Sequence, residues 1–152
     1  RQIAESTDRA AHLTSQLLAL ARAESSHEKT HAIELVDLEA LVRQVTLEWV
    51  PAAMAKKIDL GFEGTGWPVQ VGGSPLLLRE LIVNLIDNAV KYTPEGGRIT
   101  VRCGWLAGAP FAEVEDSGAG IDPDERRRVF ERFYRSPKAV ADGSELGLSI
   151  VR

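Results

Sequence analysis

The most informative pattern of apolar and polar positions runs through Leu77–Pro94. Apolar side chains recur there at helical spacing and predict one buried stripe, made up of Leu78, Leu81, Ile82, Leu85, Ile86 and Ala89. A second stripe, at i, i+4, i+8 and i+11, carries Glu80, Asn84, Asn88 and Lys91. Amides on a mostly buried helix are costly unless something polar contacts them. On this stretch alone, the second stripe indicates either a site for a metal ion with phosphates or the wet face of an ordinary amphipathic helix.

The rest of the chain alternates helical and strand patterns. Helices are expected over residues 1–24, 37–51 and 122–133, with a further one beginning at 146. Asp37 is predicted to cap the second of these, and Pro51 to kink or end it. Ser74 followed by Pro75 is predicted to begin the central helix.

Strands are expected over residues 33–36, 58–62, 69–71, 98–105 and 111–115, with a hairpin loop at 106–110. Alternation predicts that the inward-facing side chains of the hairpin are Ile99, Val101, Cys103, Trp105, Ala112 and Val114. Helices interleaved with strands, one pair of which is a clear hairpin, predict an α+β fold. We expect a two-layer sandwich with helices on one face of a mixed sheet, preceded by one long helix.

Domain organisation follows from the same patterns. Residues 1–24 are expected to form an amphipathic helix, which would need a partner for its apolar stripe, either a second helix or a second copy of the chain. Residues 25–32 are expected to be a linker, and 33–152 a single domain. Because the chain lacks an initiator Met and starts and stops inside helical patterns, we expect a fragment of something longer.

Composition narrows the functional classes. With 44% hydrophobic and 26% charged residues the chain is globular, and its net charge of −4 gives no electrostatic case for binding nucleic acid or an anionic membrane. The single cysteine, Cys103, excludes an intramolecular disulfide and a cysteine-rich zinc site. His27 and His31 match the zinc-protease spacing H-E-x-x-H, but they fall in a polar linker without a third ligand, so the match is taken as chance.

Two further segments carry chemistry. Asp116-Ser117-Gly118-Ala119-Gly120-Ile121 directly follows a predicted strand. Asp116 could accept a hydrogen bond from an exocyclic amine such as that of adenine, and the glycines allow a close approach of backbone to a ligand; the alternative is a simple glycine-rich turn. Gly143–Leu148 opens the last helix, where backbone N–H groups favour phosphate. Neither a Walker motif nor a dinucleotide fingerprint is present.

Together these segments resemble the catalytic and ATP-binding domain of bacterial sensor histidine kinases, which has the Bergerat-type fold also used by gyrase and MutL ATPases. NLIDNAVKYTP resembles the family's asparagine box, DSGAGI its first glycine box, RVFERFYR its phenylalanine box and GSELGLSIVR its second glycine box. The helix ending LLALARAES resembles the second helix of the family's dimerisation and phosphoacceptor hairpin.

The resemblance implies a role for each matching residue. Asn84 matches the ligand of Mg2+, Asn88 the contact to metal-bound phosphate, and Lys91 the phosphate-binding lysine. Glu80, one turn before Asn84, is a possible base, although transfer to an imidazole requires no activated water. The other implied nucleotide contacts are an aromatic side chain, a carboxylate for the adenine amine, glycines under the base and glycines at the phosphates: Tyr92, Asp116, Gly118, Gly120, Gly143 and Gly147.

The chain departs from the family pattern in two respects. Glu145 stands where the second glycine box usually has its middle glycine, and a carboxylate near a triphosphate predicts weakened nucleotide binding. The first hairpin helix with its phosphoacceptor histidine, and the end of the domain after Arg152, are absent from this sequence. As it stands, the fragment is therefore not expected to autophosphorylate in the family's manner.

The function implied is transfer of the γ-phosphoryl group of Mg-ATP to a histidine, for relay to an aspartate of a response regulator. The implied partners are ATP, a response regulator receiver domain and a second copy through the helical hairpin, with the domain cytoplasmic and the parent an inner-membrane sensor. Two alternatives stay open: a non-catalytic nucleotide-binding or dimerisation module, and an anti-sigma-factor serine kinase on the same fold. The helix over residues 1–24 argues against the second.

Overall fold

In the computed structural model of this chain, residues 33–121 are described. Their elements follow the order β1 (Glu34–Asp37), α2 (Leu38–Ala55), β2 (Asp59–Glu63), β3 (Gln70–Gly73), α3 (Pro75–Tyr92), β4 (Arg98–Leu106) and β5 (Ala109–Asp116). The expected helices at 1–24, 122–133 and from 146, and the expected linker at 25–32, lie outside the described residues.

Helix α2 begins as the sequence predicts. The Asp37 carboxylate Oδ1 accepts from the Ala40 backbone N–H at 3.2 Å, which satisfies one of the first-turn donors that a helix leaves unpaired. Pro51 lies inside the helix, which continues to Ala55, so the expectation that Pro51 ends it is wrong. Ala53, in the turn after Pro51, is 1% exposed, and this packing stabilises helical geometry beyond the missing N–H.

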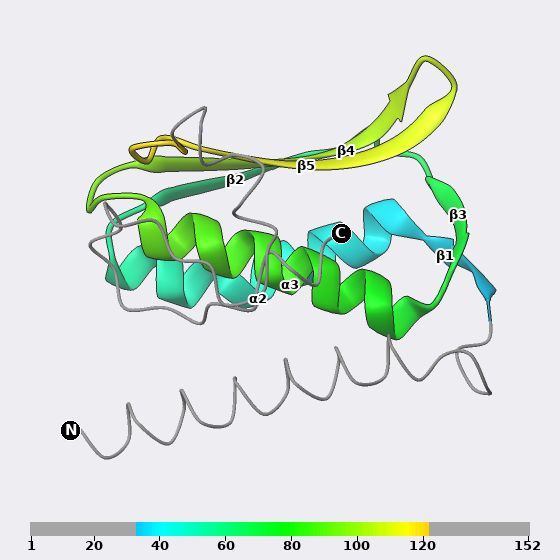
Figure 1. The fold of residues 1–152 in the computed structure, drawn as a ribbon, viewed down its shortest axis with the longest axis horizontal. Coiled ribbons are helices and arrows are strands. Elements are labelled where there is room, and N and C mark those ends of the chain that lie inside the picture. The colour runs from blue at the N-terminus through cyan, green and yellow to red at the C-terminus, as the bar shows by residue number, and fades with distance from the viewer. Residues whose placement is uncertain (1–32, 122–152) are drawn as a thin grey trace. The chain divides into compact units, whose positions relative to one another are not determined.

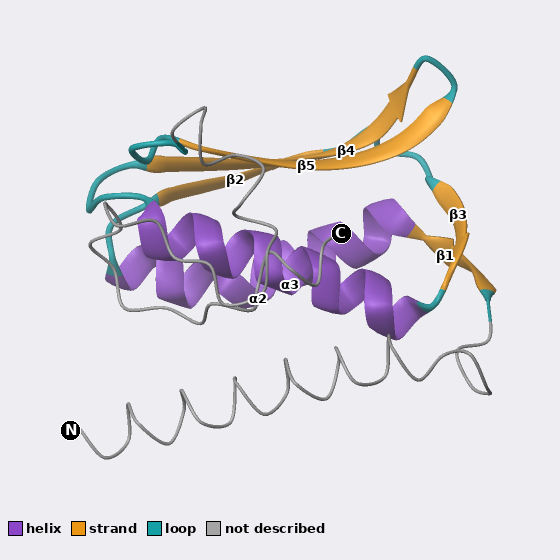
Figure 2. Ribbon diagram, in the orientation of Figure 1, coloured by secondary structure: helices purple, strands orange, loops and turns teal. Residues whose placement is uncertain are grey.

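The strands form two separate sheets (Figure 2). β4 is the central strand of a mixed three-stranded sheet, parallel to β2 and antiparallel to β5. Helices α2 and α3 lie side by side on one face of this sheet, which confirms the predicted α+β arrangement (Figure 1). β1 and β3 pair antiparallel in a two-stranded sheet of their own, a separation that the strand patterns alone did not predict.

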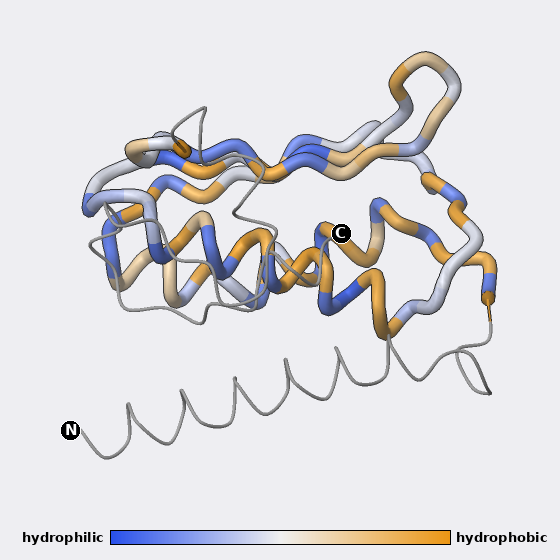
Figure 3. The backbone as a smooth tube through the Cα atoms, viewed as in Figure 1, coloured by the Kyte–Doolittle hydropathy of each residue, from blue (hydrophilic) through white to orange (hydrophobic). Residues whose placement is uncertain are grey.

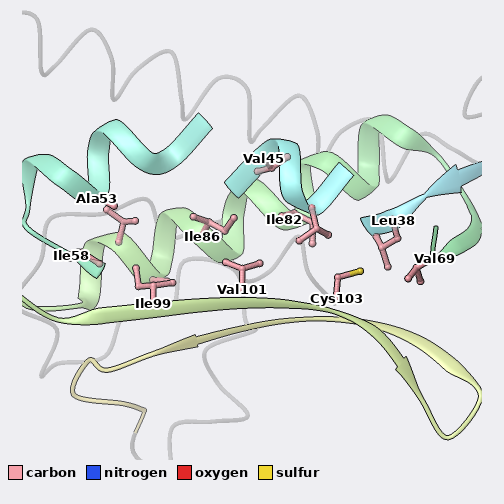
Figure 4. Packing of buried hydrophobic residues seen from close by; sticks show 13 residues of the cluster. Leu38, Val45, Ala53, Ile58, Val69, Ile82, Ile86, Ile99, Val101 and Cys103 are labelled. Atoms are coloured by element: carbon pink, nitrogen blue, oxygen red, sulfur yellow. The ribbon is translucent and has the colours of Figure 1, made fainter. Parts of the chain in front are cut away.

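The core lies between the helix pair and the sheet (Figure 4). Each element contributes β-branched side chains that are 0% exposed: Val42 and Val45 from α2, Ile82 and Ile86 from α3, and Ile99 and Val101 from β4. Hydrophobic and hydrophilic residues are interspersed along both helices, as amphipathic helices on a sheet require (Figure 3). Of the apolar stripe predicted for α3, Ile82, Ile86 and Ala89 are buried, and Leu78, Leu81 and Leu85 are only partly buried.

The β4–β5 hairpin differs from expectation in two details. Its turn is only Ala107–Gly108, whose φ angles of 51° and 81° are both positive, as a two-residue type I′ turn requires. The predicted loop at 106–110 is therefore too long, since Leu106 already pairs with Ala109. Trp105 was expected inward but is 50% exposed, because this end of the hairpin curves away from the helices (Figure 1).

Candidate nucleotide site

Helix α3 presents the polar stripe that the sequence predicts. The helix begins at Pro75, with the Ser74 hydroxyl accepting from the Leu77 backbone N–H at 3.5 Å. Asn84 is 1% exposed, whereas Glu80 and Asn88 are partly buried. With a rise of about 1.5 Å per residue, Asn84 and Lys91 lie roughly 10 Å apart along the helix axis. The stripe is thus not a wet face: its central amide is enclosed.

Lys91 is held on its own helix. Its Nζ lies 2.6 Å from Asp87 Oδ2, one turn earlier, and the two side chains are only 25% and 10% exposed. Sequence reasoning missed Asp87 as a member of this group. An acidic residue four positions before a lysine was the available signal, since i,i+4 neighbours lie on the same helix face.

Two polar atoms near the end of α3 have no hydrogen-bond partner within residues 33–121. One is the side-chain amide nitrogen of Asn88, and the other is the hydroxyl oxygen of Thr93, the residue that ends the helix and is 0% exposed. A buried polar atom without a partner costs free energy that a ligand or water can recover. Asn88 therefore has a donor available on the stripe between Asn84 and Lys91.

Asp116 and Gly118 lie against the end of α3. Asp116 is the last residue of β5, is exposed, and pairs across the ladder with Ile99; its Oδ1 accepts from the Gly118 backbone N–H at 2.8 Å. A Cβ at Gly118 would lie 2.8 Å from the Tyr92 carbonyl oxygen and 2.7 Å from Asp116 Oδ1. Only glycine allows this approach, which brings the first glycine box beside Tyr92.

Two hydrogen bonds join the start of β4 to the residue that follows β5. The Ser117 backbone N–H donates to the Arg98 carbonyl at 3.0 Å, and the Arg98 N–H donates to the Ser117 hydroxyl at 2.9 Å. Gly97, the residue before Arg98, packs against both Thr93 and Ser117. A Cβ there would collide with Thr93 Cγ2 and would lie 2.8 Å from the Ser117 hydroxyl. The start of β4, the end of β5 and the end of α3 are thereby in contact.

Lys56, just after α2, reaches the end of α3 from the neighbouring helix. Its Nζ donates to the Val90 and Lys91 carbonyls at 2.9 and 2.8 Å. These are among the last carbonyls of α3, which have no partner within the helix. No sequence signal could have found this contact, because 34 and 35 positions separate the residues.

The structure therefore brings together most of the predicted site residues. Glu80, Asn84, Asn88, Lys91 and Tyr92 share α3, and Asp116 and Gly118 meet its end. Gly120 follows with a φ of 71°, a conformation that glycine adopts without strain. Gly143 and Gly147 lie outside the described residues.

The donor set within residues 33–121 sets a limit on metal binding. No group of three or more His, Cys, Asp or Glu side chains there could hold a metal ion. Mg2+ commonly uses one or two protein ligands together with substrate phosphates and water. The stripe on α3 fits a cation that arrives with a nucleotide better than one bound by the protein alone. The same residues contain no helix that is long and apolar enough to cross a bilayer.

Comparison with known proteins gives consistent matches. Residues 73–152 match the family of histidine kinase-, DNA gyrase B- and HSP90-like ATPases. The sensor protein QseC of Escherichia coli K12 is 38% identical over 99% of this chain, and the chain spans about a third of that relative's length, 32%.

Two solved structures extend this likeness. The mycobacterial sensor histidine kinase MprB is 37% identical with a TM-score of 0.66, over 78% of this chain and 75% of that one. Full-length ShkA, crystallised in complex with AMPPNP, is 32% identical with a TM-score of 0.79, over 97% of this chain and 30% of that one. The chain belongs to the family of histidine kinase-like ATPases and carries the ATP-binding catalytic domain of a sensor histidine kinase.

Proposed function

We propose that the chain binds Mg-ATP along the polar stripe of α3 and transfers its γ-phosphoryl group to a histidine on a helical hairpin, from which a response-regulator aspartate receives it. The observation that carries this proposal is the meeting of the α3 stripe with Asp116 and Gly118 at the Tyr92 end of the helix. This arrangement offers side chains that can contact the adenine ring, the phosphates and a Mg2+ ion of one nucleotide. The AMPPNP complex of ShkA supports a nucleotide as the occupant.

Each residue takes a separate task in this proposal. Asp116 accepts from the adenine amine, while Gly118 and Gly120 leave room under the base and Tyr92 packs beside the nucleotide. The Asn84 amide oxygen ligates Mg2+, and the Asn88 amide, whose nitrogen lacks a partner within residues 33–121, donates to a phosphate oxygen.

Lys91 offsets developing negative charge on the phosphates, and bound Mg2+ supplies further charge neutralisation. Gly143 and Gly147 are assigned to the phosphates by motif alone. Glu80 takes second place, because an imidazole nitrogen attacks with its own lone pair and needs no base to activate a water. Phosphoryl transfer here depends on positioning and on charge more than on acid–base chemistry.

The first experiment measures Mg2+-dependent ATP binding by calorimetry. Asn84→Ala and Asn88→Ala should each weaken binding by about tenfold or more, a loss in the range of charge-assisted hydrogen bonds. Gln44→Ala removes an exposed amide from α2, which donates to Glu48 Oε1 at 3.3 Å, and serves as the control. Affinity that is unchanged in Asn84→Ala would overturn the central assignment.

The second experiment separates catalysis from binding. A hairpin carrying the phosphoacceptor histidine is supplied separately, together with γ-labelled ATP, and acid-labile label on the hairpin is measured. Label on a serine of a partner protein instead would identify the anti-sigma-factor type of kinase.

A non-catalytic nucleotide-binding module is the second candidate, and Glu145 is the observation that favours it. A carboxylate among the phosphate-binding glycines would repel the triphosphate. Glu145→Gly should then tighten ATP binding and restore transfer to the supplied hairpin. An affinity that does not change would remove this explanation.

A further inference from the structure

We propose that Lys56 is a positioning residue for the phosphate-binding end of α3, an inference that rests on the proposed function. Its ammonium donates to two successive carbonyls, those of Val90 and Lys91, at 2.9 and 2.8 Å. Lys91 is thus held twice: Asp87 holds its side chain, and Lys56 holds its backbone. Lys56 itself makes no ion pair with any residue of the 33–121 segment.

The contact completes the end of a helix. Of the carbonyls in the last turn of α3, that of Ala89 accepts from the Thr93 N–H at 2.9 Å, and Lys56 serves the next two. Carbonyls left without partners at a helix end make its last turn prone to fray. Lys56 therefore fixes the backbone from which the Lys91 and Tyr92 side chains project.

Lys56 is well placed to act as a fixed support. It follows directly on α2, its N–H donates to the Ala53 carbonyl at 3.1 Å, and its own carbonyl accepts from the Gly96 N–H at 3.4 Å. Ala53 and Ile58, on either side of it in sequence, are 1% and 5% exposed. The residue thus joins the end of α2 to the end of α3 and to the turn that leads into β4.

Its charge has a second effect. The aligned peptide dipoles of a helix leave partial negative charge at the C-terminus, which would repel a nearby polyphosphate. An ammonium bonded to the terminal carbonyls offsets that charge. Lys56 thereby favours an anion beside Lys91 without contacting the anion.

Lys57 provides a matched control one residue away. It is exposed, and its Nζ pairs with the exposed Glu95 carboxylate at 2.6 Å, its one ion pair within residues 33–121. Replacing either lysine with Met removes one positive charge and keeps an unbranched side chain that is one heavy atom shorter. Only the change at Lys56 removes the hydrogen bonds to α3.

The test compares the affinities of the full chain for Mg-ATP and for adenosine, by calorimetry, in Lys56→Met, Lys56→Arg, Lys57→Met and Asn88→Ala. Lys56→Met should weaken ATP binding by about tenfold, because the last turn of α3 loses both a partner and a charge. The loss for adenosine should be several times smaller, since Lys91 is assigned to the phosphates. Lys56→Arg can donate to both carbonyls and should recover most of the affinity, and Lys57→Met should bind as the unaltered chain does.

Equal losses for ATP and adenosine, or affinities in Lys56→Met that match those of Lys57→Met, would overturn the proposal. Circular dichroism establishes that each variant is folded at the temperature used. Should Lys56→Met not fold, Lys56→Gln, which keeps one amide donor, is measured with the same two ligands and judged by the same ratio. Failure of the proposed function is distinct: the unaltered chain would then not bind Mg-ATP, or Asn88→Ala would bind it equally well.

Discussion

Lys91 Nζ lies 2.6 Å from Asp87 Oδ2, one turn back along α3, with the two side chains 25% and 10% exposed. The lysine assigned to phosphate is therefore held by a protein carboxylate in this structure. In the proposed function, the triphosphate shares that ammonium with Asp87. The ion pair also makes Lys91 part of the fold, so that loss of affinity in a Lys91 variant has two possible causes.

Lys91→Met is accordingly expected to lower the free energy of unfolding by about 1–3 kcal/mol, because the largely buried Asp87 carboxylate loses its ion pair with Lys91. Lys57→Met removes an exposed pair and should cost no more than about 0.5 kcal/mol. Urea denaturation followed by circular dichroism measures both. The double variant Asp87→Asn/Lys91→Met should recover part of the loss; equal stabilities of Lys91→Met and Lys57→Met would contradict this account.

Gly118→Ala tests the approach of the first glycine box to α3. The added Cβ would lie 2.7–2.8 Å from Asp116 Oδ1 and the Tyr92 carbonyl, so the segment must shift, at a cost of about 1–3 kcal/mol in stability. Adenosine affinity should fall as well, because the shift moves Asp116. Gly61→Ala in β2 is the control, since a Cβ there meets no atom within 4 Å. Similar melting temperatures of the two variants would show that the segment around Gly118 accommodates a Cβ without strain.

Glu39 sets an expectation for acid stability. This carboxylate is 4% exposed and accepts from the Thr65 hydroxyl at 2.6 Å and from the backbone N–H groups of Thr65 and Gly66 at 2.8 and 3.0 Å. The Thr65 hydroxyl is the main cause that lowers the pKa of Glu39 below its ordinary value of 4.5. A lowered pKa in the folded state contributes stability above about pH 4.5, and this contribution is lost as the pH falls through the folded value.

Glu39→Gln should therefore be less stable than the unaltered chain at pH 7, and the difference should narrow as the pH falls below about 4. Urea unfolding across this pH range checks the trend. Glu95→Gln, which alters an exposed carboxylate, should show no such narrowing. A difference that stays constant with pH would exclude ionised Glu39 as its source.

Cys103 is predicted to be a poorly reactive thiol. It is 3% exposed, and burial is the main cause that raises the pKa of its thiol to about 11. Only the thiolate attacks a disulfide reagent, so that at pH 8 about one molecule in a thousand is reactive while folded. Labelling with a chromogenic disulfide should be slow in buffer and complete within the mixing time in urea. Fast stoichiometric labelling of the folded chain would show that β4 opens readily.

The sequence predicted most of the architecture because hydrophobic periodicity and capping residues are local signals. Asp37 and Ser74 begin their helices where expected, and the Ile99–Val101–Cys103 face of β4 is buried. Trp105 was misplaced because alternation fixes which side of a strand a residue faces, but not where the covering helices stop. The separation of β1 and β3 from the main sheet depends on pairing between distant segments, which no local pattern records.

The candidate site divides in the same way. The polar stripe of α3 and the Asp116–Gly120 segment could be predicted from sequence motifs. Lys56 and Gly97 were not, because their importance comes from residues that the fold brings near: the Val90 and Lys91 carbonyls for Lys56, and Thr93 with Ser117 for Gly97. The role of Glu80 as a base remains a prediction from its place one turn before Asn84.

The parallel pairing of β2 with β4 has a consequence for how the domain folds. Parallel neighbours require a crossover connection, and here the crossover contains β3 and the whole of α3. The pairs Asp59–Arg98 and Glu63–Arg102 therefore close a loop of about forty residues, and such distant contacts form slowly. We expect α3 to gain its final placement only when that loop closes. Nucleotide binding during refolding should then appear in the slowest phase, after the β4–β5 hairpin has formed.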